Sequence, residues 1–171
     1  LPDQDVVSWT ALITGYTEHN YGETALKYFE QMQVQGITPN VVTFCCGLKA
    51  CMGMRDVGKG EEIHIEIKRC PSLKGDLVVG SALINMYATF GLLEKAQEVF
   101  DSLPEKTTTL WNTLIIVYTE CNHGKEALEC LKQMQLEGFI PNAVTLVCSL
   151  KACISIGAID KGQQIHAEIV K

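Results

Sequence analysis

Apolar residues recur at helical spacing along most of this chain. Over residues 7–18 one stripe is formed by Val7, Leu12, Ile13 and Tyr16. Steps of three to four residues predict an amphipathic α-helix. A second helix is expected over residues 23–35, where one face carries Ala25, Leu26, Phe29 and Met32. The segment Asn20-Tyr21-Gly22 should separate the two helices, and Gly36 followed by Pro39 should end the second helix.

The same helix-pair pattern continues downstream. Further helices are expected over 82–88 and 96–103, then over 114–120 and 127–134, with breaks or stops at Gly91, Pro104, Gly124, Gly138 and Pro141. Two more first helices should include 48–51 and 150–153, followed by second helices that carry Ile63 with Ile67 and Ile165 with Ile169. No stretch alternates as a strand would. The sequence therefore predicts an all-α fold.

The chain also contains a copy of itself. Residues 8–69 align with residues 110–171 at a constant offset of 102 residues and without a gap. The matched pairs include Trp9 with Trp111, Pro39 with Pro141, Cys51 with Cys153 and His64 with His166. Self-similarity at a fixed offset is typical of a repeat architecture.

Similar openings subdivide this long period. VVSWT, VVTFC, LVVGS, TTLWN and AVTLV begin at residues 6, 41, 77, 108 and 143. The predicted units are therefore 6–40, 41–76, 77–107 and 108–142, followed by a cut-short unit at 143–171. Their lengths cycle from 35 to 36 to 31 residues before the cycle restarts.

In this length cycle the sequence resembles the pentatricopeptide repeat family, in particular its plant PLS subclass. The motifs ALKYFEQMQVQGITPN, LKAC, KGEEIH, SALINMYATFG and KAQEVFDSLP carry the resemblance over nearly the whole chain. It implies one right-handed α-solenoid of helix-turn-helix repeats over 1–171, in the order P, L, S, P and truncated L. Residues 1–5 would be the tail of a preceding S unit.

The family is itself the known example of a code that reads one RNA base per helical repeat. By resemblance, the fifth and last residues of a unit contact the base edge. The pairs would be Thr10 with Asn40 for adenine, Asn112 with Asn142 for cytosine, and Ser81 with Thr107 leaning to adenine, although Thr107 departs from the usual Asn or Asp. Cys45 with Asp76 matches no established pair. The second residues, which would pack against bases, are Val7, Val42, Val78, Thr109 and Val144.

These positions also have an ordinary structural interpretation. Thr and Asn are common, solvated residues at helix starts, so residue type alone does not distinguish base reading from an ordinary solvated position. Trp9 and Trp111 lie one residue before the fifth position. We expect their rings to pack inside the helix pair, and base stacking is the alternative.

The charge of the chain limits how it could hold a nucleic acid. The net charge is −6, and Arg55 and Arg69 are the only arginines. Such a balance argues against a general clamp that relies on phosphate neutralisation. Glu18 and Glu120 stand where the family's backbone-facing residue would be, which leaves Lys49 and Lys151 as phosphate candidates. The alternative is that these lysines are simply solvated.

The cysteines and histidines do not predict a metal site or catalysis. The eight cysteines form no C-x-x-C pair, so small, buried thiols in a reducing compartment are expected. His64-Ile65-Glu66 and its copy at 166–168 mimic the H-x-E of zinc deaminases, but the accompanying P-C-x-x-C is absent. We therefore expect no cofactor, no metal and no enzyme activity.

The resemblance leads to two hypotheses. The first is a non-catalytic, sequence-specific RNA-binding segment of a plant organellar factor for C-to-U editing in mitochondria or chloroplasts, or, with P units alone, for RNA stabilisation or splicing. The second is a protein-interaction scaffold whose L units dock multiple organellar RNA editing factors. The sequence shows no transit segment, no membrane span and no cap at either end. We thus expect a piece of a longer array, whose open apolar ends, including Ile165, Ile169 and Val170, promote self-association.

Overall fold

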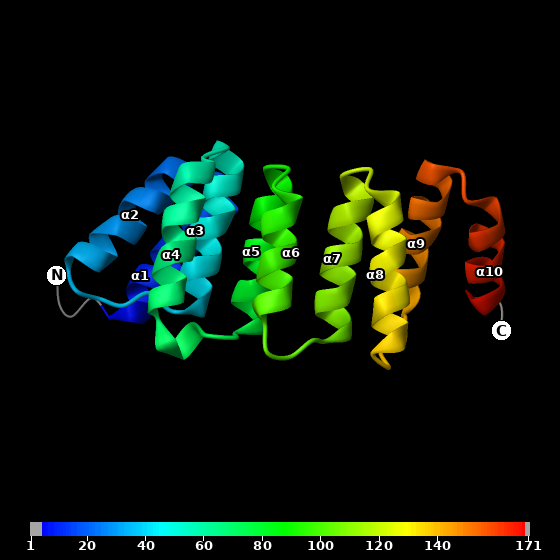
Figure 1. The fold of residues 1–171 in the computed structure, drawn as a ribbon. Helices are drawn as coiled ribbons and strands as arrows, with labels where there is room; N and C mark the ends of the chain where they lie inside the picture. The colour runs from blue at the N-terminus through cyan, green and yellow to red at the C-terminus, as the bar shows by residue number, and fades with distance from the viewer. Residues whose placement is uncertain (1–4, 170–171) are drawn as a thin grey trace. The chain divides into compact units, whose positions relative to one another are not determined.

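The computed structural model describes residues 5–169 of the chain, with side chains described through residue 167. In that range the chain forms ten α-helices and one short 3-10 helix but no strand, which confirms the predicted all-α fold (Figure 1). The helices are α1 (Val6–Glu18), α2 (Gly22–Val34), α3 (Val41–Met54), α4 (Val57–Arg69), η1 (Pro71–Leu73), α5 (Leu77–Thr89), α6 (Leu93–Ser102), α7 (Thr108–Glu120), α8 (Gly124–Leu136), α9 (Ala143–Ile156) and α10 (Ile159–Ile169). No helix among the described residues is long and apolar enough to cross a membrane.

The chain divides into two compact units, at Phe90 and Gly91. In the first unit α3 is central and packs against α1, α2, α4 and α5. In its core the rings of Phe29 and Phe44 meet edge to face, with their centroids 5.7 Å apart. Leu48 and Ile63 are also fully enclosed there.

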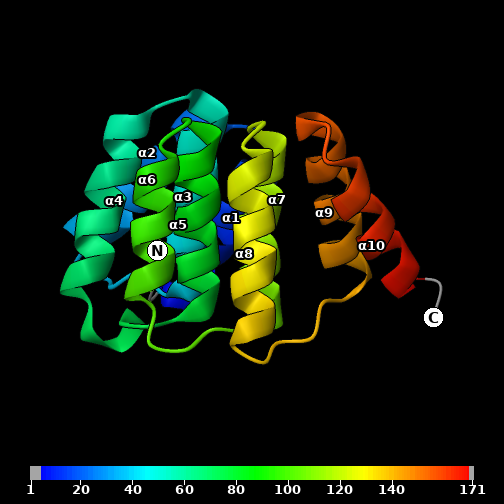
Figure 2. The ribbon, with the colours of Figure 1, turned by 45° about the vertical axis from the view of Figure 1, so that its right-hand side comes forward.

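The second unit repeats this arrangement with α7 and α9. Helix α7 packs against α6, α8 and α9, and α9 packs against α10 (Figure 2). The indole of Trp111 lies edge-on to Phe100 at 4.6 Å between ring centroids. Trp9 and Trp111 are both buried, with 4% and 3% of their surface exposed, so the expected packing role is confirmed and the stacking alternative is excluded for both rings.

Each predicted unit begins with a helix that follows a polar capping residue. Helices α1, α3, α5, α7 and α9 begin at residues 6, 41, 77, 108 and 143. The side chains that accept a backbone N–H at these five starts belong to Asp5, Asn40, Asp76, Thr107 and Asn142. Short oxygen-bearing side chains suit this position because they satisfy N–H groups that have no partner inside the helix. The last residue of one unit therefore anchors the first helix of the next.

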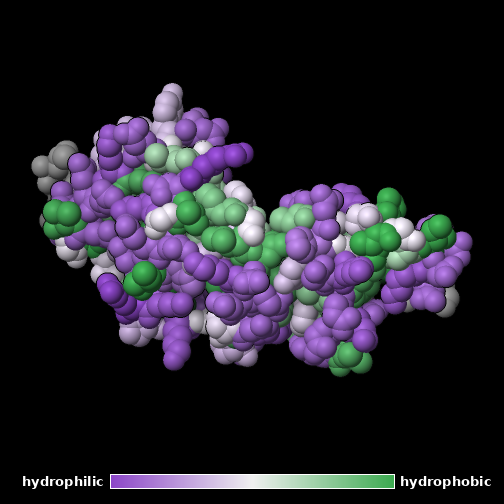
Figure 3. Space-filling view, turned by 45° about the horizontal axis from the view of Figure 1, so that its top comes forward, coloured by the Kyte–Doolittle hydropathy of each residue, from purple (hydrophilic) through white to green (hydrophobic). Residues whose placement is uncertain are grey.

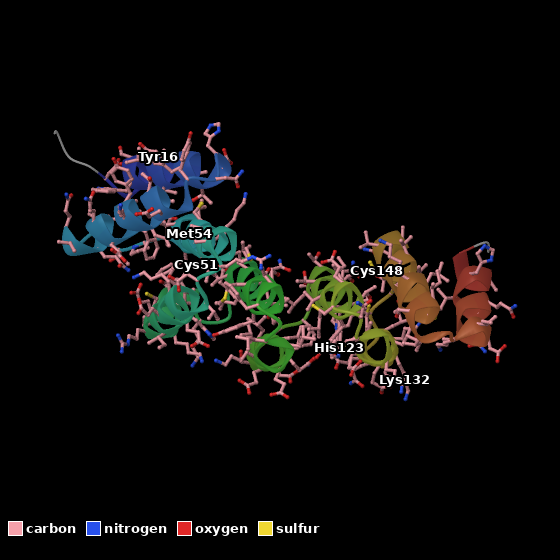
Figure 4. All side chains as sticks on the ribbon, turned by 90° about the horizontal axis from the view of Figure 1, so that it is seen from above. Tyr16, Cys51, Met54, His123, Lys132 and Cys148 are labelled. Atoms are coloured by element: carbon pink, nitrogen blue, oxygen red, sulfur yellow. The ribbon has the colours of Figure 1, made fainter. Side chains whose placement is uncertain are left out.

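The prediction that Gly22 and Gly124 themselves break the helices is wrong. Both residues lie inside helices, at the first position of α2 and α8. The turns before them instead place Asn20 and Asn122 in the left-handed region, at φ of 62° and 61°. Gly22 is needed for close packing, because a Cβ there would lie 2.9 Å from Cγ of Met54, which Figure 4 labels. The predicted stops at Gly36, Gly91 and Gly138 do have positive φ angles.

The expected open face at the carboxyl end also needs a correction. Ile165 is 2% exposed, because α10 turns this side chain inward against α9. The side chains of Ile169 and Val170, and residues 1–4 of the predicted preceding S unit, lie outside the part of the chain that the structure describes. The exposed apolar residues at this end are Ile154, Ile156 and Ile159.

All eight cysteines are free thiols, and Cys51 and Cys153 are fully buried. The other six are half-buried, which is less enclosed than expected. Figure 4 labels Cys51 on α3 and Cys148 on α9. Burial raises the pKa of Cys51 to about 12, so this thiol stays protonated at neutral pH and is a poor nucleophile.

Candidate functional site

Two residue pairs that were predicted to read bases are in contact. Nδ2 of Asn40 donates a hydrogen bond to Oγ1 of Thr10 over 3.2 Å, although 30 residues separate them. Oδ1 of Asn40 accepts the backbone N–H of Thr43 at 2.9 Å and so caps α3. The capping bond fixes the carboxamide beside α1.

The second pair is also hydrogen-bonded, but here the residue of the first helix donates and the capping asparagine accepts. Nδ2 of Asn112 donates to Oδ1 of Asn142 over 3.2 Å, again across 30 residues. Asn142 caps α9 by accepting the backbone N–H of Thr145 at 3.1 Å. Asn112 is 8% exposed, whereas Asn142 is an exposed residue. The pair thus presents one buried and one accessible amide.

A fully buried threonine lies against each pair. Neither threonine was predicted from the sequence as part of the site. Oγ1 of Thr43 lies 2.8 Å from Oγ1 of Thr10 and 2.9 Å from Oδ1 of Asn40. In the second copy the hydroxyl of Thr145 donates to Oδ1 of Asn112. Both threonines are wholly enclosed and also close capping boxes with the asparagine before them. The Asn-x-x-Thr spacing and its recurrence after 102 residues could have identified them.

These bonds determine which polar groups remain available to a ligand. The single hydroxyl proton of Thr10 is donated to the carbonyl of Val6 at 2.6 Å. Its oxygen already meets Asn40 and Thr43. The accessible Asn142 uses its oxygen for capping and for Asn112, so its Nδ2 donor group is the polar end left for contacts. The second pair therefore offers N–H donors.

The residue pairs of units three and two differ from the two pairs described above. Ser81 is half-buried on α5, and Thr107 caps α7 by accepting the N–H of Leu110 at 3.2 Å; the two residues belong to different compact units. Asp76 uses its carboxylate to cap α5, accepting N–H groups at 2.9 and 3.0 Å. Burial, with the nearby charges of Cys46 and Asp76, raises the pKa of Cys45 to about 11. Neither residue of the Cys45–Asp76 pair presents an open polar group comparable to that of Asn142.

The five predicted base-packing residues occupy the second position of their helices. Val7, Val42, Val78 and Val144 are 67%, 51%, 61% and 48% exposed, and Thr109 is also exposed. Covering an exposed valine removes apolar surface from water, which would contribute favourably to binding. The four valines therefore leave apolar surface open at the second position of their helices.

Positive charge at these helices is sparse. Lys49 on α3 and Lys151 on α9 are exposed. The charge of Lys151 partly offsets the rise that burial causes in the pKa of Cys148. Glu18 and Glu120 are exposed at the ends of α1 and α7. The surface near the pairs is therefore not strongly basic.

The histidine of the first H-x-E copy takes part in a helix-packing contact. Nδ1 of His64 lies 2.7 Å from the phenol oxygen of Tyr87, and the two rings meet edge to face. Across the described residues no group of three or more His, Cys, Asp or Glu side chains could hold a metal ion. His64 is part of the packing between α4 and α5.

Comparison with known proteins agrees with the repeat pattern. The profile of the PPR repeat family matches residues 4–53 and 106–155, and the PPR repeat profile matches residues 81–107. The chain is 35% identical to the "Pentatricopeptide repeat-containing protein At3g57430, chloroplastic" of Arabidopsis thaliana over 96% of its own length. It is 34% identical over its full length to the "Pentatricopeptide repeat-containing protein At3g24000, mitochondrial" of the same plant. The chain spans 20% and 27% of the lengths of these relatives.

The fold resembles that of a solved repeat protein. The crystal structure of the pentatricopeptide repeat protein PPR10 in complex with an 18-nucleotide psaJ RNA element superposes with a TM-score of 0.80 at 22% identity. The match covers 99% of this chain and 25% of that one. A second crystal structure, of the pentatricopeptide repeat protein PPR10 from maize, gives a TM-score of 0.72 at 21% identity. At this identity the likeness establishes the helical-repeat fold.

Proposed function

Because this chain belongs to the pentatricopeptide repeat family, we propose that it binds single-stranded RNA without catalysis, reading about one base per repeat. In this proposal the units follow the order P, L, S, P and L, and the chain is part of a plant organellar specificity factor for C-to-U editing. The family relatives named chloroplastic and mitochondrial support an organellar location.

One observation carries the proposal: the fifth residue of each P unit is hydrogen-bonded to the residue that caps the next unit. Thr10 with Asn40, and Asn112 with Asn142, are joined over the same 3.2 Å. A pair fixed in this way presents directional polar groups without further ordering. A base with the wrong edge would leave one of them unpaired, which costs about 1–3 kcal/mol where the group is buried.

The second pair favours a base edge that presents acceptors. The open Nδ2 group of Asn142 can donate to N3 or O2 of cytosine, but it cannot pair with the N3–H of uracil. The first pair leaves one N–H of Asn40 beside the occupied hydroxyl of Thr10. This donor fits the N1 acceptor of adenine. Val7 and Thr109, the second residues of these two units, would cover the base faces.

The 171-residue chain alone should bind RNA weakly. Its net charge is −6, with Glu18 and Glu120 exposed and Lys49 and Lys151 as the nearest cationic candidates. Few phosphate contacts mean little counterion release, so we expect a Kd in the micromolar range or weaker at physiological salt. Ser81 and Thr107 would add a weak adenine preference between the two strong pairs.

A binding assay with matched RNAs tests the proposal. The two P pairs are separated by two units, so the favoured site reads 5′-A-N-N-C-3′, with adenine preferred in the third place. Fluorescence anisotropy at low salt should rank this site above its A-to-C and C-to-A variants by about fivefold each, the equivalent of one net hydrogen bond. Equal binding to all three RNAs would refute base reading by these pairs.

Unit two supports a second role in docking a protein. Cys45 keeps its proton and Asp76 is occupied by the cap of α5, so this unit offers no polar pair of the P type. An L unit with few open polar groups is better suited to contact a protein surface than to contact the edge of a base. Organellar editing factors, as implied by the resemblance, are the partners to test in a pull-down that compares Val42→Asp with the unmodified chain.

A further inference from the structure

A cavity of about 470 Å³ lies among α6, α7 and α8, within the second unit. Its lining includes the aromatic residues Phe100, Trp111 and Tyr118, none of which is more than 8% exposed. Hydrophobic residues are scattered over the largely hydrophilic face that Figure 3 shows, so apolar surface alone does not single out a site. This cavity differs because three buried rings line one space, which is large enough for a small organic molecule.

The internal repeat shows why this space is open. Three of the lining residues have counterparts at the offset of 102 residues: Trp111 with Trp9, Tyr118 with Tyr16, and Cys130 with Tyr28. In the first copy the ring of Tyr28 stacks on that of Tyr16, with centroids 5.3 Å apart and planes 17° apart. The same ring lies 6.2 Å from that of Trp9. Cys130 has no ring, so the place of one aromatic side chain stays open beside Tyr118.

The rim of the cavity also differs between the copies. Its carboxylates belong to Asp101 of α6 and to Glu126, Glu129 and Glu137 in and just after α8, and all four residues are exposed. The three glutamates replace uncharged or positively charged residues of the first copy, namely Thr24, Lys27 and Gln35. The copy that lacks the ring has therefore also gained negative charge around the open space.

The groups inside the cavity respond to this charge. Burial, with the neighbouring carboxylates, raises the pKa of Cys130 to about 12, and the same causes raise the pKa of Tyr118 to about 12. The ammonium of Lys106 is already engaged, since its Nζ donates to the carbonyl of Leu103 at 2.7 Å and lies 4.9 Å from the ring centroid of Phe100. The cavity thus disfavours further negative charge, and a cation is the charged ligand that suits it.

Trp111 adds an unused hydrogen-bond donor to the lining. Its surface is 3% exposed, and within the described part of the chain its Nε1 has no hydrogen-bond partner. A buried donor without a partner is costly, and a ligand that carries an acceptor would remove the cost. Nε1 of Trp9 also lacks a partner, but there the ring of Tyr28 lies beside the indole. The donor and the open space occur together at Trp111.

We propose that this cavity binds a small arylalkylamine, a molecule that joins a flat aromatic ring to a protonated amine. The ring would take the place that Tyr28 fills in the first copy and would stack on Tyr118. The ammonium would pair with Glu126 and Glu129 at the rim. An oxygen on the ring would accept the N–H of Trp111.

Tyramine is a suitable probe, because it combines a phenol ring, a hydroxyl oxygen and an ammonium group. A ligand of about ten non-hydrogen atoms supports a Kd of about 1 mM. In NMR titrations of the full chain, isotope-labelled at the indole nitrogens, tyramine should shift the N–H resonance of Trp111 saturably and leave that of Trp9 unchanged. Phloretate, which carries a carboxylate on the same phenol ring, should bind at least tenfold more weakly.

A substitution inside the cavity tests the ring site. Cys130→Tyr should abolish the tyramine-induced shift of Trp111, because the added ring would fill the space as Tyr28 does in the first copy. The melting temperature should stay the same or rise. Absence of a saturable shift at Trp111 in the unmodified chain would overturn the proposal, as would full tyramine binding by folded Cys130→Tyr or equal binding of phloretate.

Substitutions at the rim test the role of the charge. The double variant Glu126→Gln with Glu129→Gln should weaken tyramine binding about fivefold. It should leave the binding of para-ethylphenol, which has the ring and the hydroxyl but no charge, unchanged. Glu94→Gln with Glu98→Gln is the matched control, since both carboxylates are exposed on α6 but lie outside the lining. Equal effects of the two double variants on tyramine would contradict recognition of the amine at this rim.

Discussion

The carboxamide of Asn112 donates to that of Asn142 across 3.2 Å, and the hydroxyl of Thr145 donates to Asn112 from beneath. This arrangement joins the fifth residue of one unit to the helix cap of the next. Under the proposed function, base reading and repeat stacking would depend on the same hydrogen bonds. Changes to the supporting threonine should affect both stability and RNA preference.

We expect Thr145→Val to destabilise the chain by about 1–3 kcal/mol, because the buried Oδ1 of Asn112 loses its donor. Urea unfolding would measure the loss, and Thr145→Ser should recover most of it. Thr113→Val is the matched control. Its hydroxyl donates to the carbonyl of Thr109 in its own helix, so its effect should stay within about 0.5 kcal/mol. Equal costs for the two valine variants would contradict a special role for Thr145.

A side chain at position 124 should destabilise the chain, whereas a side chain at position 53 should stabilise it. A Cβ at Gly124 would lie 2.5 Å from Oγ of Ser155 and 2.8 Å from the backbone oxygen of Ala152. We expect Gly124→Ala to cost about 1–3 kcal/mol through overpacking. Gly53, inside α3, has nothing within 4 Å, so Gly53→Ala should stabilise by up to about 1 kcal/mol. Thermal melting of both variants measures the difference, and a stabilised Gly124→Ala would refute the close approach.

These examples show where sequence reasoning reached its limit. Helical periodicity places Trp9 and Trp111 in the core, since burial of a large ring follows from its face on the helix. It could not assign Gly124, because glycine signals a turn and a close approach equally well. Thr145 was missed for another reason. Its partner Asn112 is 33 residues away, and only the packing of α7 against α9 brings them together.

Alkaline pH should destabilise the first unit through its buried thiol. Burial raises the pKa of Cys51 from 9.0 to about 12 in the folded chain. Below pH 9 the thiol is neutral in both states, so the full stability is present. Between pH 9 and 12 the unfolded chain ionises first, and stability is lost by about 1 kcal/mol near pH 10. Urea unfolding at pH 8 and pH 10 should show a smaller drop for Cys51→Ala than for the unmodified chain. Equal losses of stability in the two chains would show that other titrating groups cause the pH dependence.

Thr10→Asn should change the first pair into a copy of the second. The new carboxamide would face Asn40, as Asn112 faces Asn142, with Thr43 in the place of Thr145. We expect the preference at the first base to move from adenine toward cytosine by on the order of 1 kcal/mol. Anisotropy with RNAs that differ only at that base measures the switch. Cys45→Asn serves as the comparison, and an equal change in preference there would mean that unit two also reads RNA.

Asn142→Asp should move the preference at the last base from cytosine toward uracil. The variant keeps the cap of α9, because Asp and Asn are similarly good at accepting a helix N–H. What changes is the open end of the side chain, where a carboxylate that only accepts replaces the Nδ2 donor. Uracil presents the N3–H that this acceptor needs, so the switch should be on the order of 1 kcal/mol in relative affinity. Asn142→Ser is the control, since it retains a cap but removes the carboxamide and should lower discrimination between the two bases. If Asn142→Asp instead weakens binding to every base equally, with the melting temperature unchanged, Asn142 supports the helix and does not read the RNA.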